Sequence, residues 1–263
     1  SIIFVSGQEK CLHITLIRLY LKHIAGWQSC QTAIKQGDSQ MAINLKSTGD
    51  VAQNGVKLLV YGQAGAGKTS LIPTLPNPVI ISAEGGLLSI KDSNLPFLEI
   101  KSMDDLKEAY QWVAQSDEAS QFQSVALDSI SEAAEVVLGS EMKSNKDGRA
   151  AYGEMNTKMA EIIRAFRDLP GRHVYFSAKL EKSADEMGKV MYAPSMPGAR
   201  LGQSLPFFFD EVLALRVEPD PDGEIQRALM CGSDGRWQAK DRSGKLAMWE
   251  APDLGEIIKK IGG

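Results

Sequence analysis

The sequence predicts an α/β fold in which a mostly parallel sheet is flanked by helices and followed by C-terminal antiparallel β-hairpins. The chain of 263 residues is 43% hydrophobic and 24% charged, the composition of a globular protein with a sizeable core. Short apolar segments alternate with helical patterns from Val56 onward, and this alternation is typical of a parallel sheet with helices on both faces. Turn signals near the C-terminus favour hairpins there.

Five apolar segments are predicted to be strands, because runs of this length between turn residues suit strands buried on both faces. The segments are residues 57–61, 79–82, 124–127, 173–177 and 212–217. Helical patterns lie between them, as the crossover connections of parallel strands require.

The clearest helical pattern lies just before the fourth predicted strand. Its apolar side chains recur at 3.6-residue spacing and stop before Pro170. They are Met155, Met159, Ile162, Ile163, Phe166 and Leu169. Because this spacing places them on one face of a helix, we expect them in the core and not at a cofactor.

The remaining elements of the domain are predicted from turn residues and from residues that begin a helix. Turn residues at 220–223 and 232–235 predict antiparallel hairpins, and a short helix is predicted after Pro252 and Asp253. We therefore expect one domain over residues 41–263, with its core at about 55–218 and its hairpins and short helix at 219–263.

Residues 1–40 differ from the rest. Arg18 and Lys22 interrupt the apolar stretch 12–24, so no uncharged run is long enough to cross a membrane. A polar lead-in begins at Met41. We expect residues 1–40 to be an N-terminal extension that is non-native, disordered or helical, with an oligomerisation helix as the functional alternative.

Charge and cysteine content exclude several classes of protein. There are 29 Lys and Arg against 33 Asp and Glu, a net charge of −4, so nucleic acid could be held only by a local patch. Cys11, Cys30 and Cys231 lie too far apart to indicate a zinc site or a disulfide framework. Reduced thiols are typical of the cytoplasm, which is the expected location.

The strongest motif runs from Gly62 to Thr69 and fits the phosphate-loop pattern G-x-x-x-x-G-K-[S/T]. It follows a predicted strand and leads into a helix that Pro73 curtails, the context that the pattern needs. Its glycines let backbone N–H groups face phosphate oxygens, while Lys68 would reach the β- and γ-phosphates. The predicted ATP-binding residues are Gly62, Gln63, Ala64, Gly65, Ala66, Gly67, Lys68, Thr69 and Ser70.

A carboxylate for Mg²⁺ is predicted on a neighbouring strand. Asp128 stands at the carboxyl end of the apolar segment 124–127, where open α/β sheets bind ligands. We expect Asp128 and the Thr69 hydroxyl to hold the metal ion. The alternative is that Asp128 only caps a helix that begins near Ser131.

A second carboxylate is the predicted catalytic group. Glu84 ends the segment 79–82 and its short extension, directly after the phosphate-loop helix. From there it could orient the water that attacks the γ-phosphate. The alternative is a loop acid in front of Gly85 and Gly86.

Together these motifs resemble RecA-type ATPases, whose catalytic glutamate ends the strand after the phosphate loop. The segment Leu127-Asp128-Ser129 is also RecA-like. The resemblance implies a P-loop NTPase with a RecA-like core, in which Lys179 would act as the sensor of the γ-phosphate at the end of the fourth strand.

Residues 239–244 are similar to the K-x-R-x-G element of hexameric DnaB-type helicases. The similarity implies that Lys240 and Arg242 reach the γ-phosphate bound by a neighbouring subunit and neutralise charge in its transition state. The chain would then form a homo-oligomer, a ring or a filament, with its ATP sites between subunits. Two solvated cations beside a hairpin are the alternative.

RecA-type proteins place their DNA-binding loops between the sensor and the last core strand, here residues 180–205. The expected single-stranded DNA contacts are Lys182, Lys189, Tyr192 and Arg200. The excess of basic residues in this segment is small, so the electrostatic signal is weak, although Tyr192 could stack on a base. Residues 207–209, three phenylalanines, are expected to begin a buried strand and not to form a stacking platform.

Longer phrases resemble the phage ATP-binding proteins of the AAA-24/Sak group, RecA-core ATPases linked to single-strand annealing and recombination. Examples are AEGGLLSIKD, DSISEAAEVVL and PSMPGARLGQSLPFFFDEVLALRV. The resemblance covers roughly residues 41–261. It implies ATP-dependent handling of single-stranded DNA, beside a phage single-strand-binding protein and without a membrane.

Three other functions remain open. A DnaB-like helicase or helicase loader would use the same K-x-R-x-G element. A switch module would bind ATP with little turnover. A small-molecule kinase would need a mobile lid rich in arginines, for which residues 180–205 are the arginine-bearing candidate.

Overall fold

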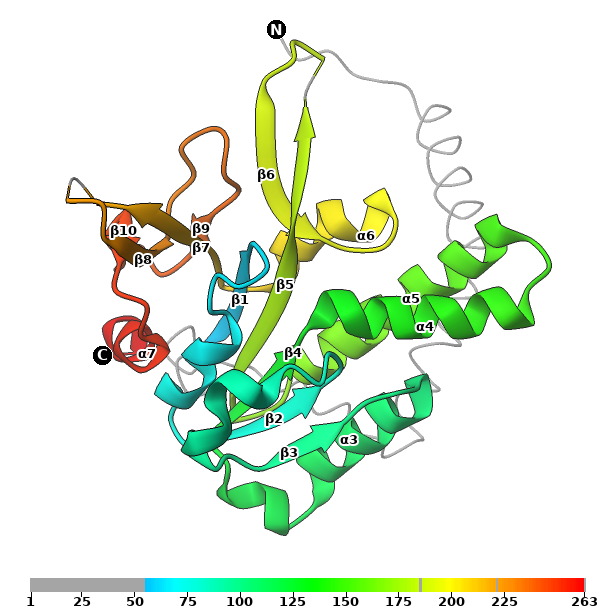
Figure 1. Ribbon diagram of the computed structural model, residues 1–263. Coiled ribbons are helices and arrows are strands. Elements are labelled where there is room, and N and C mark those ends of the chain that lie inside the picture. The colour runs from blue at the N-terminus through cyan, green and yellow to red at the C-terminus, as the bar shows by residue number, and fades with distance from the viewer. Residues whose placement is uncertain (1–54, 185, 221, 263) are drawn as a thin grey trace, which may run out of the picture. The chain divides into compact units, whose positions relative to one another are not determined.

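The computed structural model of the chain describes residues 55–262, apart from 185 and 221. The predictions for residues 1–40, for the boundary at Met41 and for Cys11 and Cys30 lie outside the described residues. The described residues belong to one compact unit. It is the predicted α/β fold, with a mostly parallel sheet and antiparallel strands toward the C-terminus (Figure 1).

All five predicted strands are present within one sheet. Its strands are β1 Lys57–Gly62, β2 Pro78–Ser82, β3 Phe97–Glu99, β4 Ser124–Asp128, β5 His173–Ala184, β6 Val190–Ser195, β7 Glu211–Pro219, β8 Ile225–Met230, β9 Lys240–Asp241 and β10 Trp249–Glu250. Their order is β10-β8-β7-β1-β5-β4-β2-β3, with β6 paired to β5 and β9 paired to β7. The pairs from β7 to β3 are parallel, and β6, β8, β9 and β10 pair antiparallel.

Helices cover both faces of the sheet. The α-helices are α3 Met103–Gln115, α4 Ile130–Ser144, α5 Gly148–Arg167, α6 Ala199–Ser204 and α7 Leu254–Gly262, and the 3-10 helices are η2 Thr69–Thr74, η3 Leu87–Ser93, η4 Glu118–Gln121 and η5 Leu205–Phe208. Because successive strand residues face opposite ways, Leu59 and Tyr61 pack with α3, α4 and α5, while Leu58 and Val60 pack with η2 and α7. Figure 1 shows α4 and α5 side by side on their face.

Helix α5 confirms the predicted apolar stripe. Met155, Met159, Ile163 and Phe166 are fully buried, and the helix ends before Pro170. Its start is fixed by Asp147, whose side chain accepts a hydrogen bond from the backbone N–H of Arg149. Strand β3 was not predicted, because it has only three residues and its side chains are largely exposed.

The C-terminal hairpins are only partly as predicted. Strands β7 and β8 form the hairpin expected around the turn at 220–223, and α7 follows Asp253 as expected. The turn at 232–235 instead lies in an irregular loop, because the Asp234 carboxylate accepts hydrogen bonds from the backbone N–H groups of Arg236 and Trp237. Only the two-residue strands β9 and β10 follow it.

The expectation of loops at 180–205 is wrong. Strand β5 continues to Ala184 and pairs with β6, so that a hairpin extends beyond the sheet (Figure 1). The prediction that residues 207–209 begin a strand is also wrong. Phe209 is fully buried, but Phe207 is 78% exposed and both Phe207 and Phe208 lie in η5. Within the described residues, no helix is long and apolar enough to cross a membrane.

Candidate functional site

The phosphate-loop motif forms a turn between β1 and η2. Gly65 and Gly67 have φ angles of +74° and +103°, which L-residues with a side chain rarely adopt. A Cβ at Gly62 would lie 2.9 Å from the carbonyl oxygen of Leu215. The motif therefore needs glycine at these positions. The helix that follows is the short 3-10 helix η2, which contains Pro73.

Lys68 lies at the mouth of this loop. Its Nζ donates hydrogen bonds to the carbonyl oxygens of Gly62 and Gln63, at 3.1 and 3.0 Å. Burial lowers the pKa of the Lys68 ammonium, while the nearby carboxylates of Glu84 and Asp128 raise it. The predicted phosphate-binding lysine and the two predicted carboxylates therefore share one electrostatic environment.

Asp128 and Thr69 meet as predicted. The Thr69 hydroxyl donates a 2.7 Å hydrogen bond to one carboxylate oxygen of Asp128, and Asp128 is only 2% exposed. Oxygen ligands of this kind, one hydroxyl and one carboxylate, are the donors that Mg²⁺ prefers. The donor set therefore fits a magnesium ion bound beside the phosphate loop.

The expectation that the Asp128 strand neighbours the loop strand is wrong. Strand β5 lies between β1 and β4, and β2 lies beyond β4. As a result β5 contributes Ser177, whose hydroxyl donates to the second carboxylate oxygen of Asp128. Tyr175 of the same strand donates a 2.9 Å hydrogen bond to the backbone carbonyl of Lys68. Sequence reasoning missed both, although a serine inside the apolar run of residues 173–178 was a usable signal.

Glu84 follows β2 at the same edge of the sheet. One of its carboxylate oxygens accepts a hydrogen bond from the hydroxyl of Ser129. Ser129 is the residue directly after Asp128. Ser129 is also the N-cap of α4 and accepts from the backbone N–H of Glu132. Because Ser129 caps this helix, the alternative reading of Asp128 as a simple helix cap is wrong.

Lys179 lies at the end of the regular β5 pairing with β1, opposite Gly62. Its Nζ forms an ion pair with Glu132, and this hydrogen bond raises the pKa of Lys179. The Glu84 carboxylate acts on it in the same direction. Lys179 is thus near the predicted catalytic acid, and its sensor role remains a prediction.

Lys240 and Arg242 lie away from the phosphate loop of their own chain. Asp241 of β9 pairs with Glu211, and Glu211 pairs with Leu58 near the start of β1. Four residues of strand separate Leu58 from Gly62, or about 13 Å. The element therefore lies toward the amino ends of the strands, and its action on a neighbouring subunit remains a prediction.

Lys240 and Arg242 differ in their contacts within the chain and in the exposure of their charged groups. The Lys240 ammonium donates to the carbonyl oxygens of Pro206 and Phe209, at 2.8 and 2.6 Å, which holds β9 against η5. Lys240 thus has partners within its own chain, and its role toward a neighbour's γ-phosphate remains a prediction. Arg242 pairs with Asp210 at 2.9 Å, but its side chain is 57% exposed.

The predicted DNA contacts separate into two places. Lys182 and Tyr192 are paired across the β5–β6 hairpin, and Lys189 precedes β6 in the same hairpin. One face of Tyr192 is already taken, because its ring stacks on Trp237 with centroids 4.2 Å apart. Arg200 lies elsewhere, on α6, where it lines a cavity of about 410 Å³ with Arg164.

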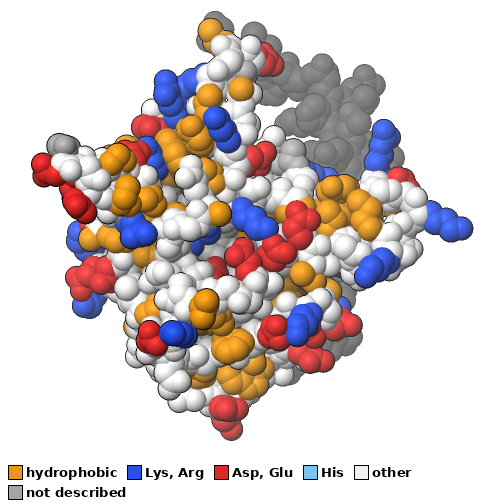
Figure 2. Space-filling view, viewed as in Figure 1, with side chains coloured by type: hydrophobic (Ala, Val, Ile, Leu, Met, Phe, Trp, Pro, Cys, Tyr) orange, Lys and Arg blue, Asp and Glu red, His pale blue; other side chains and the backbone are white. Residues whose placement is uncertain are grey.

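Charge is dispersed over the face of the protein that Figure 2 shows. On the face shown in Figure 2, Lys and Arg side chains alternate with Asp and Glu and do not merge into a continuous stripe. This face therefore has no continuous basic surface of the kind that holds nucleic acid by bulk charge, in keeping with the net charge of −4.

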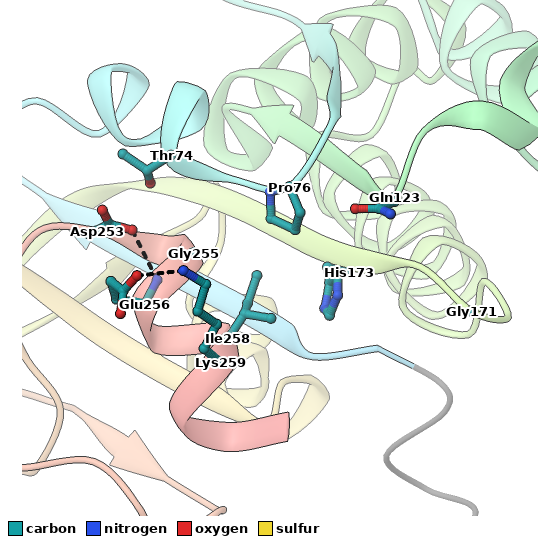
Figure 3. A pocket seen from close by; sticks show the side chains of 10 residues that line it. All are labelled: Thr74, Pro76, Gln123, Gly171, His173, Asp253, Gly255, Glu256, Ile258 and Lys259. Atoms are coloured by element: carbon teal, nitrogen blue, oxygen red, sulfur yellow. Dashed lines mark hydrogen bonds and ion pairs between the residues drawn. The ribbon is translucent and has the colours of Figure 1, made fainter. Parts of the chain in front are cut away.

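A cavity of about 630 Å³ lies at the opposite edge of the sheet, between α7 and the amino ends of β2, β4 and β5 (Figure 3). It is lined by Pro76, Gln123 and His173 on the strand side and by Glu256 and Lys259 on α7. Ligands of open α/β sheets bind at the carboxyl ends of the strands, so this cavity is separate from the phosphate-loop site.

One buried acid lies next to the Arg242 element. Glu211 is 0% exposed, and one of its carboxylate oxygens accepts a 3.3 Å hydrogen bond from the backbone N–H of Ser243. Burial, together with the nearby carboxylate of Asp241, raises the pKa of Glu211 to about 8. Glu211 is therefore protonated in the folded protein at neutral pH.

We expect Glu211 to make stability depend on pH. Its pKa in the fold, about 8, lies above the ordinary value of 4.5. Its contribution to the free energy of unfolding is therefore fully present below pH 4.5 and is lost as the pH rises to and through about 8. Glu211→Gln should flatten this decline, measured by urea unfolding at about pH 5.5 and about pH 8.5. Glu224→Gln, at the exposed β7–β8 turn, is the control, and an unchanged pH slope in Glu211→Gln would contradict the assignment.

Comparison with known proteins gives a family match and distantly related solved structures. The model of a family described as an AAA domain matches residues 54–243. No curated protein matches the chain. A KaiC-like protein from the hyperthermophilic archaeon Pyrococcus horikoshii OT3 is 15% identical, covers 67% of this chain and 78% of its own, and superposes with a TM-score of 0.38. The family match spans the phosphate loop, Glu84, Asp128 and β9.

Proposed function

Because this chain belongs to the AAA domain family, we propose that it is a Mg²⁺-dependent ATPase whose turnover is coupled to single-stranded DNA. The observation that carries the proposal is the meeting of Lys68, Thr69, Asp128 and Glu84 at one edge of the sheet. These groups come from separate strands and loops, so their convergence is a property of the fold.

Each group has a distinct task in ATP hydrolysis. The phosphate-loop N–H groups and Lys68 would bind the β- and γ-phosphates. Thr69 and Asp128 would hold Mg²⁺, which supplies positive charge to the phosphate oxygens when bound. The Ser177 hydroxyl donates to one oxygen of the Asp128 carboxylate. This contact orients the other oxygen of Asp128 toward Thr69.

Glu84 is suited to orient the attacking water. It is exposed, and its contact with Ser129 keeps its carboxylate next to Asp128. A carboxylate there can accept a proton from water as the oxygen attacks phosphorus and the bond to ADP breaks. Because the Ser129 side chain is short, the Glu84 carboxylate that it contacts lies close to the backbone at the start of α4.

The coupling to DNA is supported by the path of β5. The strand that supplies Ser177 and Lys179 to the nucleotide site continues into the hairpin that carries Lys182 and Tyr192. A change at the γ-phosphate could therefore reach the hairpin through one continuous strand. The resemblance to phage annealing ATPases favours single-stranded DNA, beside a single-strand-binding protein, as the partner.

Oligomerisation is supported by the position of Arg242. Its exposed guanidinium lies too far along the sheet to serve its own phosphate loop, by the register of β9, β7 and β1. An arginine supplied to a neighbour's γ-phosphate is worth about 10³–10⁵ in turnover. We propose Arg242, without Lys240, as this group.

The test is phosphate release at several protein concentrations, with and without a poly-dT oligonucleotide. We expect turnover per subunit to rise with concentration and to rise about tenfold or more with DNA. Arg242→Gln and Lys68→Ala subunits should each be inactive, but a mixture should regain turnover, because one supplies an intact phosphate loop and the other an intact Arg242. Turnover that ignores both DNA and concentration would contradict the coupling and the shared site.

Further assays on the same protein distinguish the other candidate functions. Unwinding of a forked duplex would favour a helicase or helicase loader. Tight ATP binding with negligible phosphate release under every condition would favour a switch module. Transfer of the γ-phosphate to a small acceptor in place of water would favour a kinase.

A further inference from the structure

The two sides of the phosphate loop are chemically different. The predicted catalytic and metal-binding acids, Glu84 and Asp128, come from β2 and β4, which lie beyond β5 on one side of β1. Strands β7 and β8 lie on the other side. Because the γ-phosphate must face the acids and the metal ion, the α-phosphate end of a bound nucleotide must face β7 and β8.

Arg227 reaches the loop from that second side. It lies on β8, paired with Val217 of β7, two residues beyond the Leu215–Leu229 pair. Leu215 itself lies against Gly62, the first residue of the loop. The Nε of Arg227 donates a 3.0 Å hydrogen bond to the carbonyl oxygen of Ala66. A Cβ added to Gly67 would lie 3.4 Å from the same nitrogen.

The rest of the guanidinium is available for a ligand. Arg227 is exposed, and among the described residues it forms no ion pair with a carboxylate and no other hydrogen bond. Arg216, its neighbour across the hairpin, is by contrast paired with Glu218 and lies over the ring of Trp237. Arg227 is thus a cation held beside an anion-binding loop, with both terminal amino groups uncommitted.

We propose that Arg227 binds the α- and β-phosphates of the nucleotide held by its own subunit while its Nε anchors the loop at Ala66. The inference rests on the proposed ATPase function and adds a nucleotide-binding residue to that site. A guanidinium can grip two phosphate oxygens at once while a third N–H bonds the protein. Arg227 would then stabilise ATP and ADP alike, in distinction from Arg242, which is assigned to a neighbour's γ-phosphate.

The experiment measures ATP and ADP affinity by titration calorimetry for the wild type, Arg227→Gln and Arg227→Lys. Arg227→Gln should weaken both nucleotides by about 10–100-fold and change kcat by no more than about threefold. The affinities of Arg227→Lys should lie between those of the wild type and Arg227→Gln, because lysine keeps the positive charge but cannot donate two parallel hydrogen bonds as a guanidinium does. Arg236→Gln is the matched control, since Arg236 is also an exposed arginine and its loss changes the net charge equally.

A salt series separates phosphate contact from loop support. Because Arg227 is exposed, a direct contact is screened, so the gap between wild type and Arg227→Gln should shrink at about 1 M salt. A gap that salt leaves unchanged, or one that appears for ATP only, would overturn the proposal. The proposal would also be overturned if Arg227→Gln bound ADP as tightly as the control Arg236→Gln does. A wild type that binds no ATP would instead refute the proposed function itself.

Discussion

Replacing Glu84 with glutamine is expected to abolish ATP turnover and to leave ATP binding intact. The change removes the group that accepts a proton from the attacking water, which is worth about 10²–10⁴-fold. It keeps the size of the side chain, and a glutamine oxygen can still accept the hydrogen bond from Ser129. We therefore expect the variant to hold ATP without hydrolysing it and to keep its fold.

Single-turnover phosphate release and ATP titration measure the two effects separately. Glu135→Gln is the control, because Glu135 is an exposed acid on α4 and lies on the same helix that Ser129 caps. If Glu84→Gln released phosphate at the wild-type rate, Glu84 would be the loop acid of the alternative interpretation. If it also lost ATP binding, its main task would be structural.

Replacing Lys68 with alanine is expected to abolish ATP binding. Two charge-assisted hydrogen bonds to phosphate oxygens would be lost, and each contributes about 1.5–3 kcal/mol. The affinity for ATP should therefore fall by about 10²-fold or more. Folding should change little, since the Lys68 ammonium has no carboxylate partner among the described residues and donates only to the carbonyl oxygens of Gly62, at the end of β1, and Gln63, in the exposed loop.

Fluorescent-nucleotide binding and thermal unfolding check this result together. Lys91→Ala, which removes an exposed lysine at the end of η3, controls for the lost charge. ATP affinity within about threefold of the wild type would mean that the loop does not bind phosphate through Lys68. The two variants also form a pair: Glu84→Gln should favour the ATP-bound form and Lys68→Ala the empty form. Comparing their DNA affinities would show which form binds DNA.

Much of the fold and the site follows from local patterns. Residues 57–61 predicted a strand because both of its faces are apolar, and the structure buries Lys57–Gly62 on both sides. Gly65, Gly67 and Lys68 could be assigned because their chemistry depends on neighbours within a few residues. Asp128 and Glu84 could be assigned because each follows an apolar strand, and the carboxyl ends of parallel strands lie at one edge of a sheet.

The missed features depend on strand order and register. Ser177 could not be paired with Asp128 without knowing that β5 lies between β1 and β4. The contacts of the Lys240 ammonium with Pro206 and Phe209 depend on the register of β9 and could not be predicted from the sequence. Arg227 carried no motif at all, and only the β7–β8 pairing brings it to Ala66.

By itself, then, the sequence determined the fold class, the phosphate loop and the two acids at strand ends, since these are written in short-range spacing and in the alternation of apolar and polar residues. Tertiary structure alone decided which strands are neighbours, that Arg227 contacts the phosphate loop and that Lys240 contacts Pro206 and Phe209. The physical reason is that pairing between strands more than 100 residues apart is set by burial of whole faces, as in the contact of Lys57 with Val174, and leaves no periodic trace in either strand.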